Sequence, residues 1–211
     1  NDVKTDTLLL GFVLLSSWGL IAWLQQRRWY YALAGFSALA LGLLAKGPMG
    51  AVVPLLTAGF YLVAKRRWAA LLRWEWYAAV PWVLLLLTPM LIGLYNQYGT
   101  DGWYFFFWKQ SFGRITGENQ WRSESDPLFF VHTFLWSFLP WALLSVAAAA
   151  SVVSRWVRYR RLPAAEVATL GVVLLVFVIL SQSHYKLPHY IFVIYGHVAV
   201  FTSAEALRWT Q

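Results

Sequence analysis

Four polar segments hold the residues that could do chemistry, and one of them carries a lysine in a position suited to phosphate binding. Lys46 lies in Ala45-Lys46-Gly47-Pro48, between two apolar runs. An ammonium group at the turn between two helices, beside a helix N-terminus, would attract a phosphate or pyrophosphate at a membrane surface. A lysine that caps a short helix and extends its ammonium group to water fits the same position. The sequence leaves both interpretations open.

A second segment, 96–127, mixes cations with carboxylates. A guanidinium group such as that of Arg114 binds phosphate through two parallel hydrogen bonds. A carboxylate such as Glu124 could serve as a general base or as a ligand of a divalent metal ion. The alternative is a solvated loop whose charges neutralise one another, formed by Lys109, Arg114, Glu118, Arg122, Glu124 and Asp126.

A third segment, 181–190, separates the last two apolar runs and places Tyr185, Lys186 and Tyr190 at one level. Its histidines, His184 and His189, stand five residues apart across a proline, which is not a recognised spacing of metal ligands. We therefore expect a loop that forms hydrogen bonds outside the membrane.

The fourth segment ends at Asp6, just before the first apolar run. Its carboxylate could cap a helix, where the helix dipole stabilises negative charge, or contact a substrate. His132 and His197 lie within or near apolar runs, and we expect both to be neutral packing residues without a chemical role.

The composition is that of a membrane protein. Hydrophobic residues make up 60% of the chain and charged residues 12%, and the mean hydropathy is +0.54, whereas about 25% of the residues of a soluble domain are charged. The cations flank apolar runs, where lipid headgroups are the expected counter-charge, so nucleic-acid binding is not expected. Cysteine is absent from the sequence, which excludes disulfides and thiolate metal sites.

The apolar runs predict an all-α, polytopic bundle of about seven transmembrane helices. A bilayer core of about 30 Å needs roughly 20 helical residues, and these runs lack the alternation of a membrane β-barrel. An aromatic stretch over 101–112 is too short to cross, so we expect an interfacial helix in an extracytoplasmic loop, with Lys109 facing water. The predicted spans cover about 7–24, 30–45, 48–64, 77–95, 128–150, 166–182 and 190–207.

Arginine-rich gaps orient this bundle. The positive-inside rule makes the side that carries them cytoplasmic, so a functional site is expected on the opposite side. No Asp, Glu, Lys or Arg lies near the centre of a predicted span, which disfavours an ion pathway. A lipid or polysaccharide transporter and a non-catalytic scaffold remain alternatives to an enzyme. The gaps hold eleven of the 17 basic residues: Arg27, Arg28, Lys65, Arg66, Arg67, Arg73, Arg155, Arg158, Arg160, Arg161 and Arg208.

The order of the polar segments resembles the GT-C class of membrane glycosyltransferases, in particular the bacterial branch related to protein O-mannosyltransferases and lipid A aminoarabinose transferases. The matching motifs are Lys4-Thr5-Asp6-Thr7-Leu8, Ala45-Lys46-Gly47-Pro48, Gly113-Arg114-Ile115-Thr116-Gly117 followed by Asp126-Pro127-Leu128-Phe129-Phe130 and Leu139-Pro140-Trp141, and the segment from Ser181 to Tyr190.

The resemblance implies a transferase that moves a sugar from a polyprenyl-phosphate carrier to a hydroxyl of a lipid, glycan or protein acceptor. Such an enzyme would lie in the bacterial cytoplasmic membrane, with its site facing the periplasm. The substrate-binding residues implied are Lys46, Arg114, Tyr185, Lys186 and Tyr190. Among them Lys46, Arg114 and Lys186 would hold the phosphate leaving group.

Two departures from the family pattern affect catalysis. The family's catalytic aspartate lies in a first extracytoplasmic loop, and this chain is expected to begin beyond that loop. The principal aspartate is thus expected upstream of Asn1, and 1–211 would be a partial domain, inactive alone. Asp6 and Glu124 are then the candidate carboxylates within the chain. The family often carries a histidine where this chain has 122–126, and Glu124 could replace it as a ligand of a divalent metal ion, the one cofactor considered.

Overall fold

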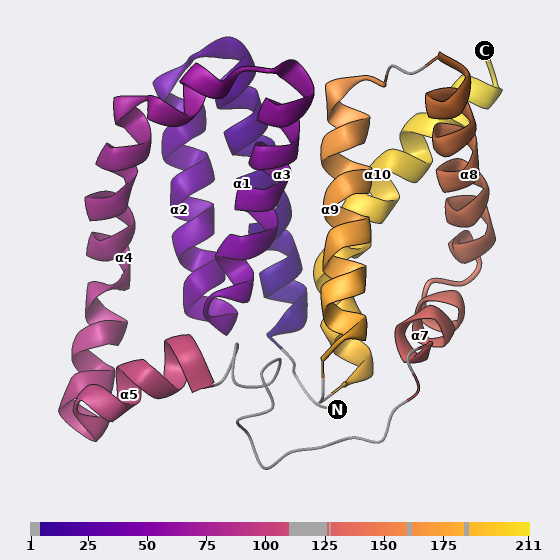
Figure 1. Ribbon diagram of the computed structural model, residues 1–211. Coiled ribbons are helices and arrows are strands. Elements are labelled where there is room, and N and C mark those ends of the chain that lie inside the picture. The colour runs from indigo at the N-terminus through magenta and orange to yellow at the C-terminus, as the bar shows by residue number, and fades with distance from the viewer. Residues whose placement is uncertain (1–4, 110–125, 127, 160–161, 184–185) are drawn as a thin grey trace.

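A computed structural model describes residues 5–109, 126, 128–159, 162–183 and 186–211, and these residues form helices and short connections without a β-strand (Figure 1). The predicted all-α class is confirmed. The helices are α1 (Asp6–Gln26), α2 (Trp29–Lys46), α3 (Met49–Lys65), α4 (Trp74–Tyr98), α5 (Thr100–Tyr104), α7 (Phe129–Ser137), α8 (Trp141–Tyr159), α9 (Ala164–Ser181) and α10 (Phe192–Trp209), with short turns η1 (Trp68–Leu72), η2 (Phe105–Lys109) and η3 (Pro188–Ile191).

Five helical segments of the described chain are long and apolar enough to cross a membrane: α1, α2, α4, α9 and η3 with α10. The chain is therefore a multi-pass membrane protein. Helix α3 is apolar but has only 17 residues, which at about 1.5 Å per residue gives about 26 Å, less than a bilayer core. With α7 and α8 counted together the number of spans rises to six, so the structure has fewer clear spans than the seven expected.

The predicted span over 128–150 is not one continuous helix. Helix α7 ends at Ser137, α8 begins at Trp141, and the two helices meet at an angle of 117°. Pro140 lies in the break. A proline lacks the backbone N–H that a continuous helix would use, and it disfavours helical geometry in the residue before it.

The helices alternate in direction, so the connections gather at two ends of the bundle (Figure 1). The C-terminus and the connections α1–α2, α3–α4 and α8–α9 lie at one end, which we call the arginine end because Arg27, Arg66 and Arg208 lie there. The start of α1, the α2–α3 turn, α7 and η3 lie at the other, which we call the Lys46 end. The polar segments, as far as the structure describes them, therefore lie at one end of the bundle, as predicted.

The hairpin that carries Lys46 is closed by two glycines. A Cβ atom added to Gly50 would overlap the backbone carbonyl group of Gly42, so no side chain fits between α2 and α3 at this level. Gly47, at the turn, has a φ of 63°, a backbone conformation that glycine adopts without steric cost. Small residues that let two helix backbones approach closely are typical of helix contacts in membranes. The Gly-Pro segment therefore does form the predicted tight hairpin.

The aromatic stretch after α4 forms a short helical segment, α5 and η2, that turns away from the C-terminal end of α4 (Figure 1). The Trp103 indole nitrogen donates a hydrogen bond of 2.8 Å to the Leu91 carbonyl. Gly102 lies where a Cβ atom would be 2.9 Å from the Leu94 carbonyl oxygen. The segment thus packs back on α4, as a helix lying along a membrane surface would. Its location in the interface stays a prediction, and residues 110–112 lie outside the described residues.

Candidate functional site

The Lys46 ammonium group forms an ion pair with the carboxylate of Asp6. Lys46 is the last residue of α2 and Asp6 is the first of α1. Since α1 and α2 run antiparallel, these two residues come to the same level. The Asp6 side chain is 7% exposed and the Lys46 side chain 24%, so Asp6 is the more deeply buried partner of the pair.

The ring of Tyr190 forms a second wall around the same ammonium group. Lys46 Nζ lies 5.4 Å from the centroid of the Tyr190 ring, a distance at which the π electrons of the ring attract a cation. Tyr190 belongs to η3, at the start of the last span, and its ring packs edge-on against His189. Lys46 is thus held by two groups that lie far from it in the sequence.

Lys186 lies four residues before Tyr190 and joins this end of the bundle to α7. Its side chain is buried, and Nζ donates a hydrogen bond of 3.1 Å to the backbone carbonyl of Asp126. The Asp126 carboxylate in turn accepts a hydrogen bond of 3.0 Å from the Leu128 amide, at the start of α7. The buried lysine therefore fixes the end of the long loop next to the segment 181–190.

The structure brings three of the sequence-predicted residues to one end of the bundle. Lys46 and Tyr190 are in contact, and Lys186 lies in the same chain segment as Tyr190. Arg114, Tyr185 and Glu124 lie outside the described residues, so their places stay predictions. Within the described residues no group of three or more His, Cys, Asp and Glu could hold a metal ion.

The expected catalytic aspartate upstream of Asn1 also stays a prediction. Asn1 and the three residues after it lie outside the described residues, and the described chain begins at Thr5.

The role of Asp6 as the partner of Lys46 was not predicted. Sequence reasoning offered helix capping or substrate contact for Asp6. The structure shows a carboxylate in the first turn of α1 that is committed to Lys46. The predicted spans 7–24 and 30–45 already contained this information, because two antiparallel helices of similar length bring position 6 opposite position 46.

This arrangement can hold an anion. An ammonium group has three donor protons, and Asp6 Oδ1 takes one of them. The remaining protons can be directed at phosphate oxygens, while the buried carboxylate orients the ammonium group. A phosphate that arrives from the membrane surface would therefore meet a cation whose position is already set.

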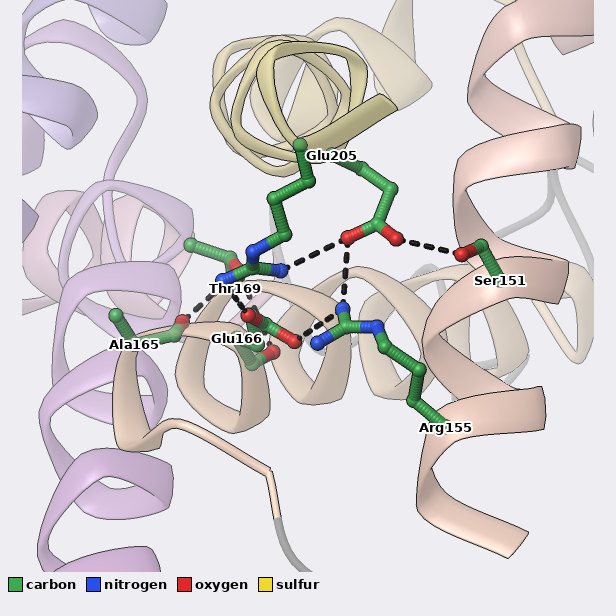
Figure 2. A network of polar contacts seen from close by, with 7 residues as sticks. Ser151, Arg155, Ala165, Glu166, Thr169 and Glu205 are labelled. Atoms are coloured by element: carbon green, nitrogen blue, oxygen red, sulfur yellow. Dashed lines mark hydrogen bonds and ion pairs between the residues drawn. The ribbon is translucent and has the colours of Figure 1, made fainter. Parts of the chain in front are cut away.

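A second charged cluster lies at the arginine end and was missed entirely by sequence reasoning (Figure 2). Glu205 is only 2% exposed. Its carboxylate accepts hydrogen bonds of 2.7 Å from Arg155, 2.8 Å from Arg208 and 2.5 Å from Ser151. Glu166 binds the same two arginines.

The charges of two arginines and two glutamates thus cancel. Their ion pairs connect α8, α9 and α10. The structure buries Glu166 and Glu205, because three helices converge on them. The cluster lies at the opposite end of the bundle from Lys46, so we assign it a structural role.

Comparison with characterised proteins shows which proteins are similar to this chain. No protein-family model matches it. The chain is 30% identical over 179 residues to undecaprenyl phosphate-α-4-amino-4-deoxy-L-arabinose arabinosyl transferase 1 of Pseudomonas fluorescens, and the match covers 85% of this chain and 30% of that protein. It is 32% identical over 155 residues to the corresponding transferase of Pseudomonas aeruginosa, with 73% of this chain and 27% of that protein covered.

A solved structure has the same arrangement of helices. The crystal structure of ArnT from Cupriavidus metallidurans, bound to undecaprenyl phosphate, superposes with a TM-score of 0.76 at 20% identity, over 95% of this chain and 36% of that one. The chain therefore spans about a third of the length of the proteins it matches. The chain belongs to the aminoarabinose transferase branch of the GT-C glycosyltransferases, as the resemblance indicated. It corresponds to one segment of those longer proteins.

Proposed function

We propose, from the relationship of this chain to the aminoarabinose transferases, that its Lys46 end binds the phosphate of a polyprenyl-phosphate-linked sugar during transfer of that sugar to an acceptor hydroxyl. The related proteins are named for an undecaprenyl phosphate-linked sugar, and the Cupriavidus structure holds undecaprenyl phosphate. We take the acceptor to be a lipid.

The observation that carries this proposal is the placement of Lys46 between Asp6 and Tyr190. In the reaction, the bond between the anomeric carbon and the phosphate oxygen breaks, and its electron pair stays on the phosphate. The acceptor oxygen bonds to the anomeric carbon, and the hydroxyl proton passes to a carboxylate base. Negative charge grows on the phosphate as the bond breaks. An ammonium group that is already oriented stabilises this charge more in the transition state than in the bound substrate.

The base is a separate question from the phosphate site. The Asp6 carboxylate is buried and engaged by Lys46, so it is not free to reach the hydroxyl of an acceptor. We therefore assign Asp6 to the orientation of Lys46, with the base supplied by another carboxylate. A divalent metal ion remains a proposal that rests on Glu124, outside the described residues.

We further propose that the protein lies in the bacterial cytoplasmic membrane with its Lys46 end towards the periplasm. The support is the arginine end, because basic residues in short loops stay on the cytoplasmic side. A polyprenyl tail would lie along exposed apolar surface of the helices, such as that formed by Leu84, Leu85 and Ile92 of α4.

Binding of the carrier by the purified chain tests the proposal. Tritiated undecaprenyl phosphate would be titrated into nanodiscs that contain the protein, the Lys46→Ala variant, or the control Lys65→Ala, which removes the same charge from the arginine end. We expect Lys46→Ala to weaken binding by about tenfold, or about 1.4 kcal/mol, and Lys65→Ala to leave it unchanged. Equal affinities for the protein and Lys46→Ala would exclude Lys46 as the phosphate ligand.

A turnover assay addresses the reaction itself. The protein at its full natural length, in proteoliposomes with radiolabelled polyprenyl-phosphate sugar and a lipid acceptor, should form glycosylated lipid, and Lys46→Ala should lower the rate by at least about tenfold. Movement of the carrier across the bilayer without sugar transfer would instead support a transporter.

A further inference from the structure

A small polar cluster lies in the interior of the bundle, among apolar helices. His197 of α10 is 2% exposed, and Ser17 of α1 and Thr57 of α3 are also buried. The Nε2 atom of His197 lies 3.1 Å from the hydroxyl oxygens of both. We call these three residues the His197 cluster. His197 packs inside the bundle as expected, and its ring in addition makes hydrogen bonds to two other helices, which was not expected.

The hydrogen bonds of Thr57 determine which ring nitrogen carries the proton. The Thr57 hydroxyl donates its one proton to the Val53 carbonyl, 2.8 Å away in the same helix. Towards His197 it can therefore only accept. Nε2 must carry the proton, shared between Thr57 and Ser17, and Nδ1 is left as an acceptor. Within the described residues Nδ1 has no hydrogen-bond partner.

A buried histidine lowers the stability of a helical bundle relative to an apolar residue of similar volume. An acceptor left without a donor inside a bundle costs free energy, and polar side chains within membrane spans usually serve a function. A leucine would fill a similar volume without that cost. A leucine could not form hydrogen bonds to α1 and α3 at the same time. We therefore look for the role of His197 in these two hydrogen bonds.

The helices joined by the cluster also carry the Lys46 site. Ser17 lies eleven residues after Asp6, three turns further along the same face of α1. Helix α3 begins three residues after Lys46, and Thr57 lies eight residues inside it. His197 lies seven residues, about two turns, after Tyr190. A shift of one of these helices along its axis would therefore separate Lys46 from Asp6 or Tyr190.

We propose that His197 is a positioning residue, which locks α1 and α3 against α10 and so holds Lys46 between Asp6 and Tyr190. Its effect on carrier binding rests on the proposed function, whereas its effect on the geometry of Lys46 does not. A bond between helices in a membrane protein contributes little by itself, about 0.6 kcal/mol on average. Two such bonds add directional contacts to the apolar packing of these helices, and they form at only one register.

Chemical labelling of Lys46 tests the geometry without any substrate. Reductive methylation of the purified chain, read by mass spectrometry, would compare Lys46, which is paired and partly buried, with the exposed Lys65. We expect His197→Leu to raise the Lys46 to Lys65 labelling ratio by about threefold or more, and His197→Gln, whose amide can still donate to both hydroxyls, to keep it within about twofold.

Thr57→Val provides a milder variant should His197→Leu fail to fold. It removes one hydroxyl at nearly constant volume, and we expect it to raise the ratio in the same direction by a smaller factor. Thr169→Val is the matched control, since Thr169 is buried and its hydroxyl bonds to carbonyls of its own helix. An unchanged Lys46 ratio in folded His197→Leu and Thr57→Val would overturn the proposal.

Carrier binding separates this inference from the proposed function. We expect His197→Leu to raise the Kd for undecaprenyl phosphate by about three- to tenfold, and to add little when Lys46 is already alanine, because it acts through Lys46. If the labelling ratio responds but the protein binds no carrier, the positioning role stands and the proposed function fails. If Lys46→Ala abolishes binding while His197→Leu changes neither measurement, the positioning role fails alone.

Discussion

Lys46 and Asp6, forty residues apart in the sequence, form an ion pair at the open end of the α1–α2 hairpin, and the carboxylate is the more deeply buried partner. This difference in burial gives the two residues different tasks. Asp6 has little access to a ligand and fixes the ammonium group, whereas Lys46 keeps part of its surface for an anion. Exchange of the two residues should therefore separate stability from binding.

The exchange variant Asp6→Lys with Lys46→Asp keeps an ion pair but reverses it. We expect each single variant to lower the free energy of unfolding by about 1–3 kcal/mol, because it leaves like charges together in a partly buried place. The double variant should recover at least half of the loss, since opposite charges face each other again. Carrier binding should not recover, because the exposed group would be a carboxylate. Thermal unfolding in detergent and the binding titration check the two expectations.

The Lys46 ammonium group lies over the ring of Tyr190, 5.4 Å from its centroid. Tyr190→Phe should therefore leave carrier affinity within about twofold, and Tyr190→Leu should weaken it by about 0.5–2 kcal/mol, the range of a cation–π contact. Equal losses in the two variants would show that the hydroxyl contributes instead. The same titration with undecaprenyl phosphate measures both.

Gly50 and Gly59 lie in the same helix and offer a matched pair. Gly50→Ala would drive a Cβ atom into the backbone of Gly42, whereas a Cβ atom at Gly59 would meet nothing within 4 Å. We expect Gly50→Ala to force α2 and α3 apart and to cost roughly 2–4 kcal/mol of stability. Gly59→Ala should be neutral or stabilise by up to about 1 kcal/mol, because alanine favours a helix. Thermal unfolding of Gly50→Ala and Gly59→Ala under the same conditions measures this difference in stability.

Glu205 joins Ser151, Arg155 and Arg208 at the arginine end. Glu205→Ala leaves two partly exposed arginines without one of their carboxylates, and we expect a loss of about 1–3 kcal/mol. Arg158→Ala, a change at an exposed arginine of the same end, should cost less than about 0.5 kcal/mol. Thermal unfolding in detergent compares the two. Carrier affinity of any folded Glu205 variant should stay near that of the protein, because the cluster lies at the far end from Lys46.

Much of the architecture follows from local features of the sequence. The apolar runs and the cations that flank them predict the helices, their alternating directions and the end that holds the polar segments, because burial of apolar length and the charges of short loops act on each segment separately. The turn at Gly47 and Pro48 was predictable for the same reason. The break at Pro140 was open to prediction too, but the apolar character of 128–150 concealed it.

The site depended on contacts between helices. Whether Asp6 caps a helix or holds Lys46, and whether His197 only packs or also bonds α1 and α3, depends on how the helices are rotated and shifted against one another. The burial of Glu166 and Glu205 by three converging helices is a result of the same kind. The sequence by itself determined which segments are helices and which end of the bundle is polar, because those properties are summed along one segment. Only the tertiary structure decided which side chains meet, because each meeting depends on the packing of at least two helices.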